Sequence, residues 1–168
     1  MTIADADPRW AALGRVACTA LEPQFREIEH VGSTSVPGLA AKPVIDLMAS
    51  VDDLDEVDAD TLDAIGFRLI PETMPERLFL RREDPDGMVY HLHVVTAESW
   101  PTRNERLLRD YLREHSDDAD RYAARKRELM ARHGAGDAYT RGKTDLVQEL
   151  TDKARAERGL PSVPVWEE

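Results

Sequence analysis

The stretch Pro43–Val51 constrains the fold more than any other part of the chain, because its residues are apolar almost without a break. A strand with one face in water alternates apolar and polar residues, whereas a continuous apolar run indicates a strand covered on both faces. Asp46 is the one charged residue in this run. The sequence therefore predicts a buried strand that carries an ionisable side chain, and a buried carboxylate needs a partner.

Apolar spacing and turn residues predict helices and strands on both sides of this run. The turn residues Asp84-Pro85-Asp86-Gly87 lie between two apolar stretches and favour an antiparallel pair of strands. The other predicted elements are a helix to about Leu21 that starts at Asp7-Pro8, a strand over 25–31, a helical stretch over 52–66, a short strand over 67–70 and helices from Ser99 onward. This order predicts an α+β fold: a mixed sheet of four to five strands with flanking helices, followed by a helical C-terminal part.

The size of the chain favours a single domain. It has 168 residues, of which 42% are hydrophobic, and a chain of this length buries roughly 70% of its unfolded surface. We expect one domain over residues 1–160 and a loose tail over 161–168. Cys18 is the only cysteine, which excludes an intramolecular disulfide and a thiolate-rich zinc site.

The charge balance narrows the classes of partner. The chain has 22 Lys and Arg against 33 Asp and Glu, a net charge of −11. Nucleic-acid surfaces depend on clustered cations, so a broad nucleic-acid interface is not expected, although a local basic pocket is compatible with this composition. No run approaches the roughly 20 apolar residues that cross a bilayer, and the N-terminus lacks the pattern of a secretory signal, so we expect a cytoplasmic protein with no membrane partner.

A loop of small residues precedes the buried strand and is a candidate anion site. Gly32, Ser33, Thr34 and Ser35 can offer backbone N–H groups and hydroxyls to a phosphate, because glycine lets the backbone approach closely. Such loops are also ordinary turns. Asp46 follows about a dozen residues later, and its alternatives are a metal ligand, a hydrogen-bonded group, or a salt bridge to Lys42 or an arginine.

Two histidines and several cations complete the candidate site. His91 and His93 are two residues apart on a predicted strand, so both side chains point to one face, where they could join Asp46 as metal ligands or bind phosphate. They could equally be ordinary histidines on a half-exposed face. Lys42 lies between the loop and Asp46. Further candidates for an anionic ligand are Arg77, Arg81, Arg82, Lys126, Tyr139, Arg141 and Lys143, each of which could also be a surface residue.

The segment His30–Leu47 closely resembles the hallmark segment of the GrpB family. Four later blocks resemble that family in the expected order: Tyr90–Val95, Arg109–Arg113, Tyr122–Lys126 and Tyr139–Lys143. The resemblance covers roughly Pro8 to Ala156. The family also occurs as a domain attached to dephospho-CoA kinase, which implies a functional link to coenzyme A synthesis.

The family is similar in fold to the nucleotidyltransferase superfamily, and this likeness implies roles for individual residues. Gly32 and Ser33 would hold phosphate, Asp46 and Lys42 would be catalytic, and Asp46 would bind Mg²⁺, Mn²⁺ or another divalent metal together with His91 and His93. Arg82, Lys126, Tyr139 and Lys143 would bind the ligand with the loop. The family pattern has a second carboxylate where this chain has Met48, which offers Mg²⁺ no hard oxygen ligand.

Two hypotheses of function follow from the resemblance. The first is a metal-dependent enzyme that transfers a nucleotidyl or phosphoryl group. The second is a binding or accessory module that keeps the pocket for a nucleotide, a CoA-type ligand or another phosphorylated small molecule without turnover. A single-metal hydrolase built on Asp46, His91 and His93 is a third alternative.

Overall fold

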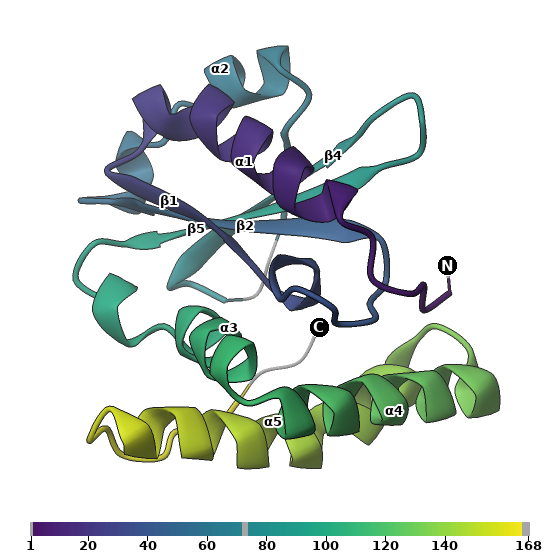
Figure 1. Cartoon of the computed structure of the whole chain (residues 1–168). Coiled ribbons are helices and arrows are strands. Elements are labelled where there is room, and N and C mark those ends of the chain that lie inside the picture. The colour runs from purple at the N-terminus through teal and green to yellow at the C-terminus, as the bar shows by residue number, and fades with distance from the viewer. Residues whose placement is uncertain (1, 72–73, 166–168) are drawn as a thin grey trace.

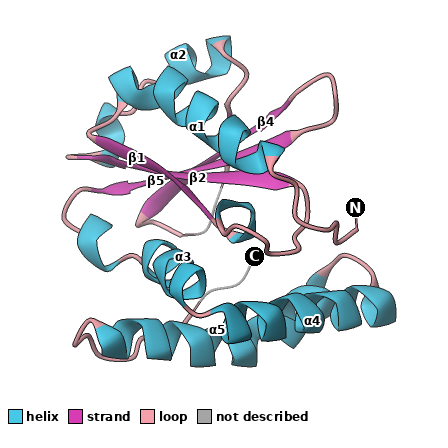
Figure 2. Ribbon diagram, in the orientation of Figure 1, coloured by secondary structure: helices cyan, strands magenta, loops and turns pink. Residues whose placement is uncertain are grey.

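The computed structural model describes residues 2–71 and 74–165, and in them one mixed sheet lies between two layers of helices (Figures 1 and 2). The strands follow the order β1-β2-β5-β4-β3 across the sheet. Their bounds are β1 Glu27–Val31, β2 Val44–Val51, β3 Arg68–Ile70, β4 Arg77–Glu83 and β5 Val89–Thr96. The α+β fold class with five strands is therefore confirmed, as is the antiparallel pair, which is β4 with β5.

The helices divide between the two faces of the sheet. In Figure 1, α1 and α2 lie over one face, and α3, α4 and α5 form a layer on the other. Their bounds are α1 Arg9–Leu21, α2 Ala59–Ala64, α3 Asn104–Glu114, α4 Ser116–His133 and α5 Asp137–Glu157. Among the described residues, no helix combines the length and the apolar character that crossing a membrane requires.

Strands β2 and β5 form the centre of the sheet and pair in parallel, while the other strand pairs are antiparallel. The register sets Asp46 beside His91 and Met48 beside His93. Because side chains alternate between faces along a strand, this register places Asp46, His91 and His93 on one face. The neighbouring residues Ile45, Leu47 and Leu92 point to the other face and are fully buried in the core under α1.

The helical layer has a separate apolar core, and the loop after β1 packs into it. Val36, Leu39 and Ala40 are each at most 4% exposed and cluster with side chains of α3, α4 and α5. The loop residues Ser33–Ser35 form a short 3-10 turn, η2. Packing against the helices therefore fixes this loop beside β2, where Asp46 lies.

The acidic stretch after β2 differs from the expected helix. It forms a short 3-10 turn, η3 Leu54–Glu56, and then the six-residue helix α2. Asp53 accepts a hydrogen bond from the backbone of Asp55, and Asp58 accepts one from the backbone of Thr61. Each aspartate caps a new turn, so the stretch divides into two pieces.

The described part of the expected loose tail, residues 161–165, lies against α5. The Gln148 side chain donates to the carbonyl of Val163 at 2.9 Å and accepts from the N–H of Val165 at 3.0 Å. Arg155 donates to the carbonyl of Pro161 at 2.5 Å. Backbone groups beyond the end of α5 thus find partners on its own side chains.

Candidate functional site

A cavity of about 430 Å³ opens between the polar face of the sheet and the helices α4 and α5. Its lining comes from most of the segments that the sequence singled out, though not from Arg109–Arg113: Gly32, Ser33, Thr34, Ala41, Lys42, Val44, Asp46, Phe79, Arg81, His91, His93, Tyr122, Lys126, Tyr139 and Lys143. Among these described lining residues, four are lysine or arginine and one is a carboxylate. The cavity thus carries the opposite charge balance from the chain as a whole, which has a net charge of −11.

Asp46, His91 and His93 meet at the floor of the cavity. His91 Nδ1 lies 3.4 Å from Asp46 Oδ1, and His93 Nε2 lies 3.8 Å from the same oxygen. One possible ligand atom from each of the three residues lies within 4.8 Å of the others. Phe79 packs against both rings, with centroid distances of 5.0 Å to His91 and 5.2 Å to His93. The aromatic side chain limits how the two imidazoles can turn.

The electrostatics of this floor keep Asp46 ionised. Burial raises the pKa of the Asp46 carboxyl, but its polar contacts with His91 and His93 outweigh burial and bring the pKa to about 2. His93 is 8% exposed, and within the described part of the chain its Nδ1 atom is buried without a hydrogen-bond partner. Its other ring nitrogen, Nε2, is the one that faces Asp46.

Gly32 allows the loop to approach the Asp46 carboxylate. The glycine has φ of 73° and ψ of −178°, a conformation that side chains strongly disfavour. A Cβ atom built at this position would lie 2.5 Å from Asp46 Oδ2. Only glycine fits both the backbone angle and the space.

The three hydroxyls of the loop, on Ser33, Thr34 and Ser35, make different hydrogen bonds. Thr34 Oγ1 donates to the carbonyl of Val44 at 2.8 Å, and Ser35 Oγ donates to the carbonyl of Gly32 at 2.5 Å. Both hydroxyl protons hold the loop itself. Ser33 Oγ instead accepts from Lys126 Nζ at 2.9 Å, which leaves its own proton for a ligand. Of the three, Ser33 is thus the one suited to bind an anion, and Ser35 does not line the cavity.

His30 holds the loop in place through a hydrogen bond to Thr34. Its Nε2 lies 2.9 Å from Thr34 Oγ1, and because that hydroxyl already donates to Val44, the ring nitrogen must be the donor. Burial lowers the pKa of His30 to about 4, so the ring is neutral at pH 7. Gly14 on α1 makes room for it, since a Cβ there would lie 2.2 Å from His30 Nδ1.

Three lysines reach the cavity from different directions. Lys126 on α4 is 3% exposed, and besides Ser33 it donates to the carbonyl of Ala40 at 2.6 Å. Lys42 Nζ lies 4.0 Å from the centroid of the Tyr139 ring, and Lys143 Nζ lies 5.1 Å from the same centroid. Burial, and then the charge of Lys143, lower the pKa of Lys42. Two like charges that share one ring would both be stabilised by an anion between them.

The candidates Arg77 and Arg141 do not line this cavity, and the structure also places the predicted ligand residue Arg82 elsewhere. It lies on the opposite face of β4, over the rings of Phe67 and Tyr90, and its guanidinium binds Asp84. Its neighbour Arg81 faces the cavity, in register with His91. The side chains of adjacent strand residues point to opposite faces, so a shift of one position exchanges the two arginines.

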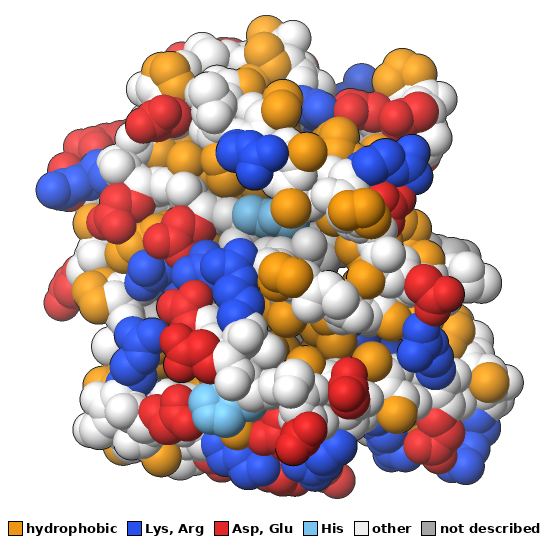
Figure 3. Space-filling model, viewed as in Figure 1, with side chains coloured by type: hydrophobic (Ala, Val, Ile, Leu, Met, Phe, Trp, Pro, Cys, Tyr) orange, Lys and Arg blue, Asp and Glu red, His pale blue; other side chains and the backbone are white. Residues whose placement is uncertain are grey.

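A charged network that the sequence analysis missed fastens α3 to the loop. Glu29 on β1 accepts from Arg106 at 3.1 Å and from Arg109 at 2.6 Å. Arg109 also donates to the carbonyl of His30, and Arg113 donates to the carbonyl of Ser35 at 2.8 Å. Acidic and basic side chains are interleaved over this face of the molecule (Figure 3). The arginine spacing on α3 was visible in the sequence, but its partners on β1 are almost 80 residues away.

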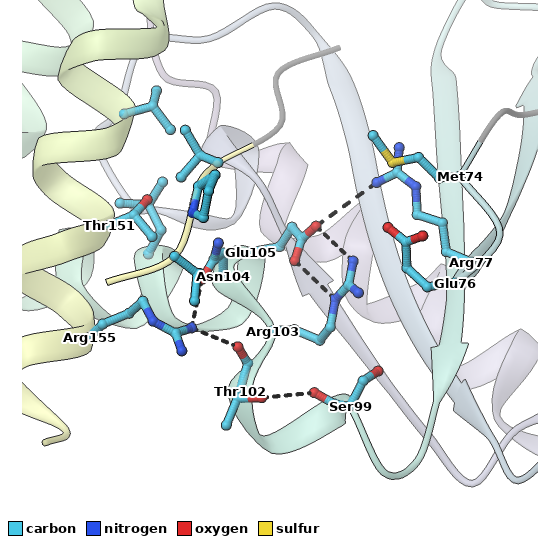
Figure 4. A pocket seen from close by; sticks show the side chains of 15 residues that line it. Met74, Glu76, Arg77, Ser99, Thr102, Arg103, Asn104, Glu105, Thr151 and Arg155 are labelled. Carbon is cyan, nitrogen blue, oxygen red and sulfur yellow. Dashed lines mark hydrogen bonds and ion pairs between the residues drawn. The ribbon is translucent and has the colours of Figure 1, made fainter. Parts of the chain in front are cut away.

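A second cavity, of about 440 Å³, lies between α3, α5 and the start of β4 (Figure 4). Its charged side chains neutralise or bind one another: Glu105 lies 3.2 Å from Arg103 and 3.9 Å from Arg77, and Arg155 donates to Asn104 at 2.8 Å. Arg155 also donates to the carbonyl of Thr102. These contacts give its polar groups a structural role in joining the two helices to the sheet.

The residues present do not fit the pair of Mg²⁺ ions that the resemblance implies. Met48 occupies the position of the second carboxylate, and it is fully buried in an apolar cluster with Val31, Val95 and Trp100. The adjacent strand contributes His91 and His93 in place of a further carboxylate. Mg²⁺ requires oxygen ligands, and this floor offers it a single carboxylate. Two-ion chemistry therefore has no ligand set here.

Comparison with known proteins finds curated relatives that are longer than this chain and that it matches over more than two thirds of their length. It is 36% identical to a UPF0157 protein of Pseudomonas aeruginosa, over 94% of this chain and 69% of that protein. It is 35% identical to a UPF0157 protein of Halalkalibacterium halodurans, over 93% of this chain and 83% of that protein.

Solved structures extend the comparison to the fold. The crystal structure of the conserved protein GrpB from Enterococcus faecalis matches with a TM-score of 0.83 and 27% identity, over 94% of this chain and 99% of that one. The Cid1 poly(U) polymerase with bound MgGTP matches with a TM-score of 0.50 and 16% identity, over 84% of this chain and 50% of that one. The fold is thus similar to that of nucleotidyltransferases. The sequence model of the family described as "GrpB protein" matches residues 1–153, so the chain belongs to the GrpB family.

Proposed function

We propose that the chain binds a nucleotide or another phosphorylated small molecule in the cavity between the sheet and helices α4 and α5. The observation that carries this proposal is the local reversal of charge. In a chain with a net charge of −11, Lys42, Lys126 and Lys143 converge on one cavity in which Asp46 is the single carboxylate among the described lining residues. Arg81 also lines the cavity, but it pairs with Glu83 at 2.7 Å, so the three lysines carry the argument. Concentrating cations costs free energy unless an anion offsets it.

The loop supports the same proposal because its shape is fixed before a ligand arrives. Thr34 and Ser35 use their hydroxyls to hold the turn, and Arg113 holds the carbonyl of Ser35. Lys126 fixes Ser33 with its proton available to an anion. A preformed site loses little conformational entropy on binding, which favours a specific small ligand.

The ligand's phosphate would lie between Lys42 and Lys143, above Tyr139, with Ser33 and Arg81 at its sides. The part of the ligand beyond the phosphate would then face Tyr122 or the open side of the cavity. A nucleotide and a CoA-type ligand both carry phosphates on an adenosine or similar group, and both are compatible with this arrangement. The volume of about 430 Å³ is in the range of small-molecule sites.

The same geometry favours a binding module over a two-metal transferase. Asp46 lacks a second carboxylate beside it, because Met48 is buried in an apolar cluster. Without that ligand pair the charge on a transferring phosphoryl group has no two-ion clamp. Binding without turnover is therefore the proposed activity, and transfer is the alternative that metal dependence would reveal.

A thermal-shift panel tests the proposal. ATP, CTP, GTP, UTP, CoA and dephospho-CoA would each be added with EDTA, Mg²⁺ or Mn²⁺. At about a hundred times its dissociation constant, a bound ligand stabilises the fold by about 2.7 kcal/mol, a rise of about 5 to 10 °C in Tm. We expect at least one ligand to raise Tm in EDTA. A panel in which none does so, with or without metal, would contradict the proposal.

Substitutions of cavity residues test whether the ligand binds in the cavity. Lys42→Ala should weaken the effective ligand at least about tenfold, because it removes one of the two ammonium groups beside Tyr139. Lys153→Ala is the matched control, since Lys153 on α5 does not line the cavity and pairs with Glu149 and with Asp118 of α4. Asp46→Asn should preserve or strengthen metal-free binding if the protein is a binding module. Metal-dependent turnover of a nucleotide by the wild type that is lost in Asp46→Asn would instead support the transferase.

A further inference from the structure

The three residues at the floor of the cavity have the composition of a transition-metal site. Asp46 contributes one carboxylate, and His91 and His93 contribute two imidazoles from the adjacent parallel strand. Imidazole nitrogen is a good ligand for zinc, iron, cobalt, nickel and copper ions, whereas Mg²⁺ prefers oxygen. The replacement of the expected second carboxylate by Met48 therefore changes which metal the floor can hold.

The distances are close to those that one ion needs. Donors bonded at about 2.0 to 2.1 Å to a tetrahedral ion lie about 3.4 Å apart. The Asp46–His91 pair is already at 3.4 Å, and the Asp46–His93 pair is at 3.8 Å. All three donor atoms lie within 4.8 Å of one another, so binding one ion would require only small shifts of these side chains.

The surroundings hold the carboxylate in place for this task. Gly32 lies against Asp46 Oδ2, so the other oxygen, Oδ1, faces both histidines. Phe79 packs against both imidazoles and restricts their rotation. These contacts fix three donors on the two central strands of the sheet, where the backbone is most rigid.

We infer that Asp46, His91 and His93 form a mononuclear transition-metal centre that prefers Zn²⁺ or Co²⁺ to Mg²⁺. His93 would bind through Nε2, the ring nitrogen that faces Asp46. The positions left open would face the cavity. A bound divalent ion would add positive charge beside the lysines, so metal and phosphorylated ligand would strengthen each other's binding. This last coupling rests on the proposed function, while the metal site itself does not.

Metal titration of the whole chain tests the inference without any phosphorylated ligand. The chain would first be treated with EDTA and dialysed, and Zn²⁺, Co²⁺, Mn²⁺ and Mg²⁺ would then be titrated by calorimetry, with the Co²⁺ spectrum as a record of coordination. We expect one Zn²⁺ per chain, bound at least about 100-fold more tightly than Mg²⁺, and a Co²⁺ absorption typical of mixed nitrogen and oxygen ligands.

Variants show whether the ion occupies these residues. His91→Ala and Asp46→Asn should each weaken Zn²⁺ at least about 100-fold, and His133→Ala, an exposed histidine at the end of α4, should leave the affinity unchanged. His91→Gln, which keeps a similar volume, would repeat the test if His91→Ala fails to fold. Zn²⁺ binding that is equal in wild type and His91→Gln, or Mg²⁺ binding as tight as Zn²⁺, would overturn the inference. Ligand binding in EDTA would still stand in either case, so the two proposals fail separately.

Discussion

The two faces of strands β2 and β5 are built from alternating residues of the same two segments, yet they have opposite characters. One face carries Ile45, Leu47 and Leu92, all fully buried under α1. The other carries Asp46, His91 and His93, which line the cavity under α4 and α5. The first face provides apolar burial, which is the main source of stability in folded domains. The second buries polar and charged groups, which costs free energy unless they are hydrogen-bonded, ion-paired or bound to a ligand.

This difference shows how a small domain can stabilise a fold and hold a site on one pair of strands. The period of two along a strand separates the tasks residue by residue. The loop Gly32–Ser35 and the helical layer then close the polar face, using the hydrogen bonds of Thr34 and Lys126. Substitutions on the two faces should therefore affect different properties of the protein.

The largest effect is expected on the apolar face. Leu92→Ala should lower the free energy of unfolding by about 2 to 5 kcal/mol, because it removes a fully buried side chain and leaves a cavity. Its neighbour His91→Ala, on the polar face and 30% exposed, should cost less than about 1 kcal/mol. Urea denaturation of both variants measures the contrast. Equal losses of unfolding free energy in the two variants would show that the two faces contribute equally to stability.

An intermediate effect is expected where the loop meets the polar face. Gly32→Ala should cost about 1 to 3 kcal/mol for the backbone conformation, and its new Cβ would also displace the Asp46 carboxylate. We expect it to abolish ligand and metal binding while the chain stays folded. Gly38→Ala is the control, because Gly38 also has a positive φ but a Cβ there meets no atom within 4 Å. Ligand and metal binding that survives in Gly32→Ala would show that the site does not need the close approach of the loop to Asp46.

The smallest effect concerns the helical layer that covers the polar face. The hydrogen bond from Tyr111 Oη, at 2.5 Å, is the main cause that lowers the pKa of Asp118 to about 2, and Arg121 and Lys153 add to it. Because the folded pKa is depressed, this contribution to stability is present above the ordinary value of 3.8 and is lost as pH falls toward 2.

Acid titration of the unfolding free energy measures this contribution. The wild type should lose more stability between pH 5 and pH 2, in the range where Asp118 takes up its proton, than Asp118→Asn does. Asp120→Asn, an exposed residue on the same helix, should behave as the wild type. A wild type and an Asp118→Asn variant with the same acid profile would remove Asp118 from the account of how the helical layer is held.

Much of the sheet could be predicted from sequence because its signals are local. The apolar run ending at Val51 and the turn at Asp84–Gly87 are read from neighbouring residues, and the spacing of His91 and His93 sets their common face. The choice between Arg81 and Arg82 was wrong, since it depends on the exact register of β4 against β5.

The details of the site depend on partners far apart in the chain. Lys126 holds Ser33 and Ala40 across roughly 90 residues, and Arg113 reaches Ser35 across almost 80. No local pattern encodes such pairs, so the sequence could offer Lys126 and Lys143 only as candidates that could also be surface residues. Likewise, only the three-dimensional structure shows that the Thr34 hydroxyl already donates to a backbone carbonyl. The Ser33 hydroxyl accepts from Lys126 and keeps its proton for a ligand.

A crystal structure of the chain grown with Zn²⁺ and a non-hydrolysable ATP analogue tests most directly whether the polar face is a ligand site. The account predicts phosphate density between Lys42 and Lys143, within hydrogen-bond distance of Ser33. It also predicts an anomalous peak about 2.0 to 2.2 Å from ligand atoms of Asp46, His91 and His93. An analogue bound only in the second cavity beside Arg77 and Arg155, with no density in the lysine-lined cavity, would contradict the account.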